Sequence, residues 1–493
     1  MSNPFFKTKS IENILKESDE GAKLKKSLTA FSLILLGVGA IIGAGLFSLT
    51  GIAAANNAGP AVTISFIVAA SGCAFAGLCY AEFASMIPVA GSAYTYSYAT
   101  MGELIAWTIG WDLILEYAVG AATVAISWSR YLIKLLEKWH VAHIPYRWMM
   151  SPFETVKVNG EEISGIMNLP AVFITVLMSL ILIRGIQESA RFNAVIVALK
   201  LTVVVVFIVL GWSYIDEANY ANYIPENTGA FENFGWTGIM TGAAVVFFAF
   251  IGFDAVSTAA QEAKNPQRDM PIGIMGSLIV CTILYVLFAH VMTGLENYQN
   301  FKNEAAPVAL AIAATPYGFM QELIIMAILA GYSSVILVLL LGQSRVFFSM
   351  SKDGLIPKMF SDIHPKFQTP WKSNLLFAGL VSLFAAFVPV SIVGEMCSIG
   401  TLLAFVLVCI GILVLRKTRP DLPRAFKTPW VPFVPIMGII VCCYLMYALP
   451  LDTWIRLFVW MAVGFVVYFA YGKKNSKLNK SDSESNPGSN VLD

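Results

Sequence analysis

Long apolar runs separated by short polar connections make up most of the chain. A helix needs roughly 20 apolar residues to cross a bilayer core of about 30 Å. By this rule we predict twelve membrane-spanning helices, which begin near residues 31, 61, 104, 169, 190, 236, 271, 317, 374, 391, 430 and 453. The pattern therefore predicts an all-α polytopic membrane protein.

The composition agrees with this pattern. Of the 493 residues, 57% are hydrophobic and only 13% are charged, a balance that a soluble domain with a solvated surface could hardly carry. The net charge of +1 provides no concentrated basic footprint. We therefore expect membrane lipids and a small molecule as partners, and no nucleic acid. All seven cysteines fall inside apolar runs, so no disulfide framework is expected.

The positions of lysine and arginine orient the chain. With the N-terminus inside, 24 of the 32 fall in cytoplasmic segments, seven fall outside and Lys200 lies within a span, which is the positive-inside bias. We expect a multi-pass protein of the plasma (inner) membrane with both termini in the cytoplasm. Five of the seven outer cations lie between residues 130 and 157, interleaved with glutamates. This long connection is predicted to fold as a small outer cap.

Glycines interrupt the first predicted span. The stretch GVGAIIGAGLF, residues 37–47, places four glycines around its middle. Small residues also let neighbouring helices pack closely, but these glycines are denser than packing requires. Irregular backbone at this depth is tolerated only where it is buried in protein or lines a cavity. We therefore predict that the first span is a discontinuous helix.

A second interruption lies in the sixth span. In FFAFIGFDAVS, residues 247–257, Gly252 and Asp254 break an aromatic and aliphatic run. The first and sixth spans each open a group of five, the placement expected for an inverted repeat with two discontinuous helices. The predicted organisation is a cytoplasmic segment 1–30, five-helix repeats 31–212 and 213–416, two further helices within 417–472, and a disordered cytoplasmic tail 473–493.

The two interruptions predict a substrate site. Beyond Gly43 a new half-helix begins with free amides, which suit a carboxylate. Before each break, carbonyls near Ile41 and Phe248 are freed and suit an ammonium group. A carboxylate beside an ammonium group is the backbone of an amino acid. The candidate substrate-binding residues at the breaks are Ile41, Gly43, Ala44, Gly45, Phe248 and Ile251.

Three ionisable residues near the middle of spans add further candidates. Glu116, Lys200 and Asp254 each cost about 2.5–3.5 kcal/mol on insertion scales if they are unpaired. Asp254 could attract a cationic side chain, or it could be a buried acid satisfied by backbone. Glu116 shares a helical face with Gly120, which leaves room for a substrate. Glu116 could bind a cation, carry a proton or make a structural hydrogen bond.

Four long motifs resemble those of the cationic amino acid transporter family. They are GAIIGAGLF (39–47), CYAEFASMIPVAGSAYTYSYATMGELIAWTIGWDLILEYAVG (79–120), FFAFIGFDAVSTAAQEAKNPQRDMPIGI (247–274) and SRVFFSMSKDGLIPKMFSDIHPKFQTP (344–370). This family belongs to the amino acid, polyamine and organocation (APC) superfamily, so the resemblance implies a LeuT-type fold with a 5+5 inverted repeat and discontinuous helices 1 and 6.

The resemblance also implies residue roles. The aspartate that matches Asp254 belongs to the family's substrate pocket, and Ala44 stands where many relatives have serine or threonine. Sodium-coupled members of this fold hold an ion between helices 1 and 8, and in proton-coupled relatives a lysine on helix 5 takes that place. By resemblance Lys200 has this proton-coupling role. The alternative is a permanently charged lysine that pins helix 1.

Residues and resemblance together predict a secondary active transporter. It would import amino acids, chiefly cationic ones such as arginine and lysine with small neutral ones as further candidates, by alternating access with proton coupling. No cofactor besides the coupling proton is expected, and the scattered histidines offer no metal site. An exchanger or uniporter without proton coupling, and a non-transporting sensor or channel, are the alternatives. An enzyme is not expected, because no nucleophile, base and oxyanion set can be assembled.

Overall fold

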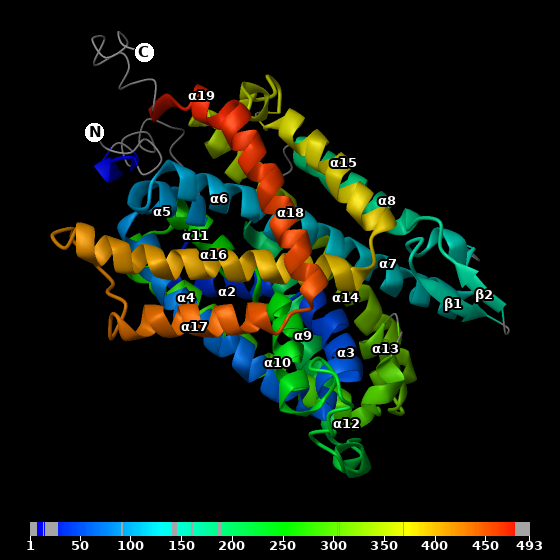
Figure 1. Cartoon of the computed structure of the whole chain (residues 1–493). Coiled ribbons are helices and arrows are strands. Elements are labelled where there is room, and N and C mark those ends of the chain that lie inside the picture. Colours follow the sequence, from blue (N-terminus) through cyan, green and yellow to red (C-terminus); the bar gives the residue numbers. More distant parts are fainter. Residues whose placement is uncertain are drawn as a thin grey trace, which may run out of the picture.

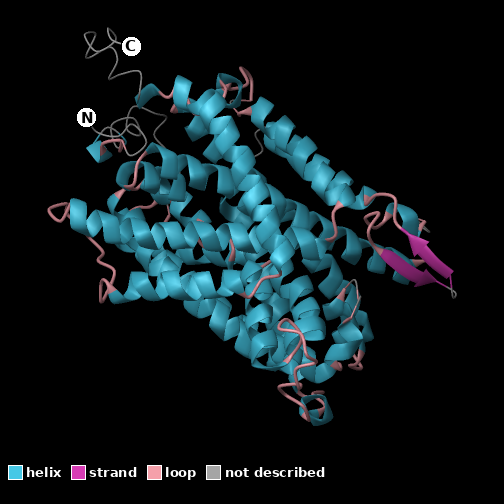
Figure 2. Cartoon of the chain, in the orientation of Figure 1, coloured by secondary structure: helices cyan, strands magenta, loops and turns pink. Residues whose placement is uncertain are grey.

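The computed structural model describes residues 7–12, 14, 28–89, 92–140, 145–158, 161–184, 190–302, 304, 306–367 and 369–478. These residues are mostly helical, and their strands form one small hairpin (Figure 2). The first and last described segments, residues 7–12 and 473–478, lie at the same end of the helical bundle (Figure 1). We call this the termini end, and we call the opposite end, which carries the hairpin, the distal end. Most of the tail predicted to be disordered lies outside the described residues.

The helices follow the predicted spans in order. In the first half they are α2 (Ala30–Ile41) continued by α3 (Thr50–Ala53), α4 (Val62–Met86), α6 (Glu103–Ile114) continued by α7 (Gly120–Trp139), α8 (Leu169–Ile183) and α9 (Ala190–Trp212). In the second half they are α10 (Gly235–Val246) followed by α11 (Ala255–Thr258), α12 (Pro266–Leu295), α14 (Gly318–Lys352), α15 (Trp371–Phe387), α16 (Val390–Thr418), α17 (Phe433–Tyr447) and α18 (Leu451–Val467). The shorter α5 (Ser92–Thr100) and α13 (Pro307–Ala313) lie in connections.

Eight helical segments of the described chain are long and apolar enough to cross a membrane. Four further apolar helices, α2, α8, α15 and α17, are shorter than 18 residues. The chain is therefore a polytopic helical protein, while the total of twelve spans and the five-plus-five repeat stay predictions.

The helices differ in how deeply they are enclosed. In the segment Glu103–Trp139, 94% of the most apolar 18-residue stretch is buried inside the protein. In Leu451–Asn475 only 22% of the corresponding stretch is buried. Exposed side chains of α18, such as Phe458 and Val459, are apolar, as expected for a helix that faces lipid. The α6–α7 helix is thus central and α18 is peripheral, where it lies across the front of Figure 1.

A buried ion network fastens the termini end. Glu82, near the end of α4, is fully buried and accepts hydrogen bonds from Arg416 Nε (2.9 Å) and Arg424 Nε (3.1 Å). The backbone N–H of Thr428 also donates to Glu82, at 2.8 Å. A buried carboxylate is tolerated only where such partners replace water. Glu82 therefore joins α4 to the end of α16 and to the connection that follows it.

A second set of contacts closes the same end. Asp353, just after α14, accepts hydrogen bonds from Lys9 Nζ at 2.9 Å and from the Tyr94 hydroxyl of α5 at 2.7 Å. Leu28 pairs with the chain after α11, because its N–H donates to Glu262 O at 3.0 Å and its carbonyl accepts from Lys264 N at 2.8 Å. The N-terminal segment is thus tied across the ends of several helices.

The connection after α7 folds, as its charge pattern predicted. Strands β1 (Thr155–Val158) and β2 (Glu161–Ser164) form an antiparallel hairpin. Arg130 forms an ion pair with Glu154, and Lys134 Nζ lies 3.2 Å from Glu304 Oε1. Part of the charge interleaving seen in the sequence is therefore ion pairing within the distal end.

Candidate functional site

The first break separates α2 from a π-helical turn at Gly45–Leu49. Ile42 leaves the helical conformation, with ψ at 108°. The Gly43 carbonyl then accepts the N–H groups of Leu46 and Phe47, both at 3.2 Å, and so starts the second half-helix. The amides that open a helix have no partner within it. Ala44 and Gly45 thus occupy the position predicted for carboxylate recognition.

The second break follows a 3₁₀ turn at Phe247–Phe250. Ile251 is extended, with ψ at 136°, and Gly252 has φ at +109°, a conformation that favours glycine. A Cβ on Gly252 would lie 3.0 Å from the carbonyl oxygen of Ala40. The two breaks therefore face one another. The Phe248 carbonyl was expected to be free, but it accepts the Ile251 N–H at 3.2 Å because the turn closes on it.

Tyr285 of α12 bridges the two breaks. Its hydroxyl lies 3.0 Å from the carbonyl oxygen of Ile41 and 2.9 Å from that of Ala249. A phenol has one hydrogen to donate, so it can serve only one of these carbonyls at a time. The carbonyl of the second break that faces Ile41 is thus that of Ala249, one residue beyond the predicted Phe248. Tyr285 was not among the site residues predicted from the sequence.

Replacing Gly45 with alanine should destabilise the protein, whereas the same change at Gly43 should be tolerated. A Cβ on Gly45 would lie 2.2 Å from Ala249 Cα, whereas the nearest atom to a Cβ on Gly43 would be Val335 Cγ2, at an ordinary contact distance of 3.5 Å. Overpacking costs typically about 1–3 kcal/mol. We expect Gly45→Ala to lower the thermal unfolding midpoint in detergent and Gly43→Ala to leave it unchanged. Equal midpoints for the two variants would contradict this packing.

Asp254, just after the second break, is one of three buried carboxylic acids in this region; Glu116 precedes Tyr117, which contacts Asp254, and Asp112 lies one helical turn before Glu116. Asp254 is fully buried, and its Oδ2 accepts the Tyr117 hydroxyl at 2.6 Å and the Ser92 hydroxyl at 3.4 Å. Glu116 and Asp112, which lie one helical turn apart, are at most 1% exposed. The other oxygen of Asp254 and all four carboxyl oxygens of Asp112 and Glu116 have no hydrogen-bond partner among the described residues.

This acid cluster is chemically incomplete. None of the ion pairs of the described residues involves Asp112, Glu116 or Asp254. Buried carboxylates without partners are strongly disfavoured. The cluster is therefore stabilised when it holds protons or when a cationic group enters. Asp112 was not among the predicted site residues, although its spacing of four from Glu116 places it on the same helical face.

Gly120 has a packing contact in this structure. A Cβ on Gly120 would lie 3.2 Å from Cys397 Sγ and 3.6 Å from Leu339 Cδ1. Cys397 Sγ also lies 3.4 Å from the Glu116 carbonyl oxygen. We predicted that Gly120 leaves room for a substrate, but α16 and α14 pack against it. Helices can approach closely where one of them carries a glycine.

Lys200 lies between the first half-helix and α14. Its side chain is 2% exposed, and its Nζ donates to the Gly39 carbonyl at 2.9 Å. A Cβ on Gly331 of α14 would lie 2.9 Å from Lys200 Cε. The ammonium group thus contacts the last turn of α2, just before the first break. Any change in its protonation acts directly on the half-helix that leads to the candidate carboxylate site.

Within the described residues, no group of three or more His, Cys, Asp or Glu side chains is arranged to hold a metal ion.

Comparison with known proteins identifies the family. Residues 28–468 match the family described as "Amino acid permease". The chain belongs to this family. The match covers both breaks, the acid cluster and Lys200, so the resemblance to the APC superfamily inferred from the four motifs is confirmed.

Curated relatives carry several substrate names. The chain is 44% identical over 480 residues to the branched-chain amino acid permease BcaP of Bacillus subtilis, covering 97% of this chain and 100% of the relative. It is 42% identical to a methylthioribose transporter of the same organism, covering 96% and 99%. It is 38% identical to cationic amino acid transporter 9, chloroplastic, of Arabidopsis thaliana, covering 86% and 73%. These permease and transporter names confirm that the chain is a membrane transport protein and not an enzyme.

Proposed function

We propose that this amino acid permease imports amino acids with cationic side chains, such as arginine and lysine, together with a proton. The observation that carries the proposal is the buried acid cluster of Asp112, Glu116 and Asp254, which lacks a cationic partner among the described residues. A lysine or arginine substrate would supply that cation, while the opening amides at Ala44 and Gly45 suit its carboxylate.

Proton coupling is proposed to involve Lys200. Its ammonium group holds the Gly39 carbonyl of α2. When Lys200 is protonated, this charge-assisted bond stabilises the arrangement of the half-helix that leads to the carboxylate site. Loss of the proton weakens the bond and favours a different position of α2. The proton would then be released in step with the substrate.

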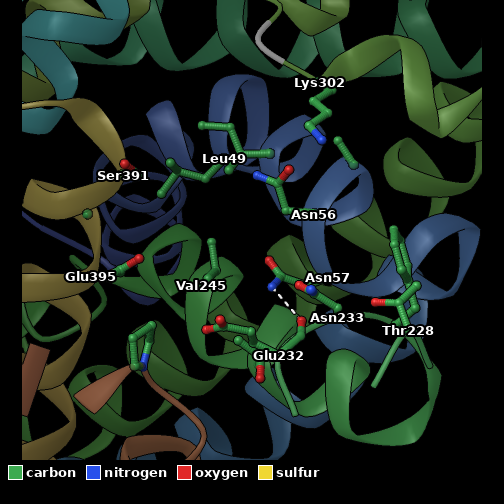
Figure 3. A pocket seen from close by; sticks show the side chains of 16 residues that line it. Leu49, Asn56, Asn57, Thr228, Glu232, Asn233, Val245, Lys302, Ser391 and Glu395 are labelled. Atoms are coloured by element: carbon green, nitrogen blue, oxygen red, sulfur yellow. Dashed lines mark hydrogen bonds between the residues drawn. The ribbon is translucent and has the colours of Figure 1, made fainter. Parts of the chain in front are cut away.

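The arrangement of the two ends supports alternating access. Lys9, Tyr94 and Asp353 tie the termini end closed, while a cavity of about 480 Å³ opens at the distal end. In the proposed cycle this cavity (Figure 3) is the outer entrance to the central site, and the tied end is the closed side. We propose that the termini end faces the cytoplasm of a plasma membrane, in line with the excess of lysine and arginine in the predicted cytoplasmic segments.

A substrate with an apolar side chain is the second candidate. Asp254 already accepts two hydroxyl groups through Oδ2, so the acid cluster could instead hold protons and leave the side-chain pocket to apolar groups. The branched-chain specificity in the name of the Bacillus subtilis relative favours this candidate.

Uptake into proteoliposomes separates these functions. We expect labelled L-arginine to accumulate against its gradient when an inward proton gradient is imposed, and not without one. Excess unlabelled L-leucine should compete weakly. Strong competition by L-leucine, with little by L-lysine, would support the apolar candidate. Uptake that only equilibrates, whatever the proton gradient, would indicate an exchanger, uniporter or channel.

A further inference from the structure

The connection between α16 and α17 is a compact loop built around one arginine. Arg424 donates to three carbonyl groups of this loop at 2.8–2.9 Å, those of Arg419, Pro420 and Leu422. It also donates to the buried Glu82 carboxylate of α4 at 3.1 Å, and its side chain is only 4% exposed. The loop lies at the left of the bundle in Figure 1. Because Arg424 fixes its backbone, the loop presents its exposed side chains from a defined position.

Three exposed cations lie in this loop and in the last turn of α16, namely Lys417, Arg419 and Lys427. We call them the loop cations. None of the ion pairs of the described residues involves them. The five cations between residues 416 and 427 face two carboxylates, those of Asp421 and Glu82, which leaves an excess of three positive charges. The surface of the loop is therefore complementary to an anion.

The Glu82 carboxylate brings two of the loop cations to the same place. It accepts the guanidinium of Arg416 and the backbone N–H of Thr428, both at 2.8 Å. Lys417 directly follows Arg416, and Lys427 directly precedes Thr428. The two lysines are ten residues apart along the chain, but the residues next to them bind one carboxylate. The loop cations therefore lie on one small surface.

An exposed aromatic ring and an apolar helix face adjoin this surface. Trp430 is 79% exposed and has φ at +46°, a conformation that side chains other than glycine rarely adopt. Indole rings at the end of a membrane helix are typical of the membrane–water interface. Along α17, the exposed residues follow a spacing of three and four and so share one face; they are Phe433, Ile436, Ile440 and Tyr444. An apolar face thus leads to the ring and to the cations.

We infer that the loop cations and Trp430 bind the headgroup of an anionic phospholipid whose acyl chains lie along the exposed face of α17. The cations supply the charge that an anionic headgroup requires, and the helix face supplies apolar contact for the chains. A zwitterionic phospholipid would gain less, because its own cation offsets its phosphate. A free anion in water would gain nothing from the apolar face. This site concerns the lipid and not the substrate, so it does not depend on the proposed function.

Native mass spectrometry tests this site on the full-length protein, released from micelles that contain equal amounts of phosphatidylglycerol and phosphatidylcholine with the same acyl chains. We expect the wild-type protein to retain phosphatidylglycerol in preference. The triple variant Lys417→Gln, Arg419→Gln, Lys427→Gln should lower the affinity for phosphatidylglycerol about fivefold for each cation removed, and leave that for phosphatidylcholine unchanged. The wild-type preference should also fall as the salt concentration rises, because exposed charges are screened.

A matched control removes three exposed cations from other elements of the same end of the bundle. Lys264→Gln, Arg268→Gln, Lys358→Gln should keep the wild-type preference for phosphatidylglycerol. If the two triple variants lose this preference equally, the lipid responds to the overall charge of this end, and the site at the loop is overturned.

A change at Trp430 separates lipid binding from folding. Trp430→Gly should lower the affinity for both lipids without lowering the thermal unfolding midpoint, because glycine adopts a φ of +46° without strain. Equal affinities of the wild-type protein for the two lipids would overturn the inference. Displacement of phosphatidylglycerol by inorganic phosphate would also overturn it, because the loop would then bind free anions and not a lipid.

Discussion

Proteoliposomes that contain the Lys200→Ala protein should fail to accumulate amino acid when an inward proton gradient is imposed. In the wild-type protein the Lys200 ammonium group is buried and holds the Gly39 carbonyl, at the end of the half-helix that precedes the first break. If this proton travels with the substrate, its removal uncouples the proton gradient from transport. Wild-type uptake should also rise as the external pH falls, because the inward proton gradient that drives it increases.

Two further substitutions separate the charge of Lys200 from its proton. Lys200→Met keeps an unbranched stem beside Gly331 and removes only the cationic group. Lys200→Arg keeps a charge that cannot be lost in a protein. If Lys200 only holds α2 in place through its charge, Lys200→Arg should keep proton-driven uptake. If Lys200 must release its proton, Lys200→Arg should lose it.

The decisive measurement is the lumen pH during substrate entry, with vesicles matched for folded protein. Wild-type vesicles should acidify in step with uptake, and all three Lys200 variants should not. If Lys200→Ala vesicles still acidify with uptake, Lys200 is not the coupling residue and Glu116 becomes the next candidate.

Much of the helix order could be predicted from the apolar pattern. Each of the twelve predicted starts lies within five residues of the start of a helix, and the largest difference is between residue 271 and Pro266. Length and hydropathy suffice here because a helix in lipid must satisfy its backbone internally. The two breaks could also be predicted, because Gly43 and Gly252 interrupt strongly apolar stretches.

Contacts between distant segments could not be predicted. Tyr285 lies 244 residues from Ile41 along the chain, and nothing in its own apolar helix distinguishes it from a core tyrosine. The close approach of Gly45 to Ala249 depends on how two helices cross. The apolar pattern of a single segment does not determine this crossing. Asp112 is a different case, since its spacing of four from Glu116 could have been noticed.

The two breaks and the acid cluster form one unit. The Cβ distances at Gly45 and Gly252 show that each half-helix leaves almost no space for the other to shift alone. Tyr285 shares one hydrogen between two carbonyls of these segments. A movement of the Ile41 carbonyl therefore changes the bonding of Ala249, five residues before Asp254. These contacts give the proposed action of Lys200 on α2 a path by which it would also reach the segment before Asp254.

Replacing Asp254 with asparagine should weaken cationic substrates selectively. Asparagine keeps a carbonyl oxygen that can accept the Tyr117 and Ser92 hydroxyl groups, so the fold should survive. A lost hydrogen bond to a charged group costs about 1.5–3 kcal/mol, which is a roughly 10- to 150-fold loss of L-arginine affinity. The affinity for L-alanine, which presents no side-chain charge, should fall much less.

The measurement is equilibrium binding of both amino acids to the full-length protein in nanodiscs. Asp421→Asn, an exposed change in the connection after α16, is the control and should leave the arginine-to-alanine ratio unchanged. Equal losses of affinity for arginine and alanine in Asp254→Asn would show that this aspartate stabilises the broken helix and does not bind the side chain of the substrate.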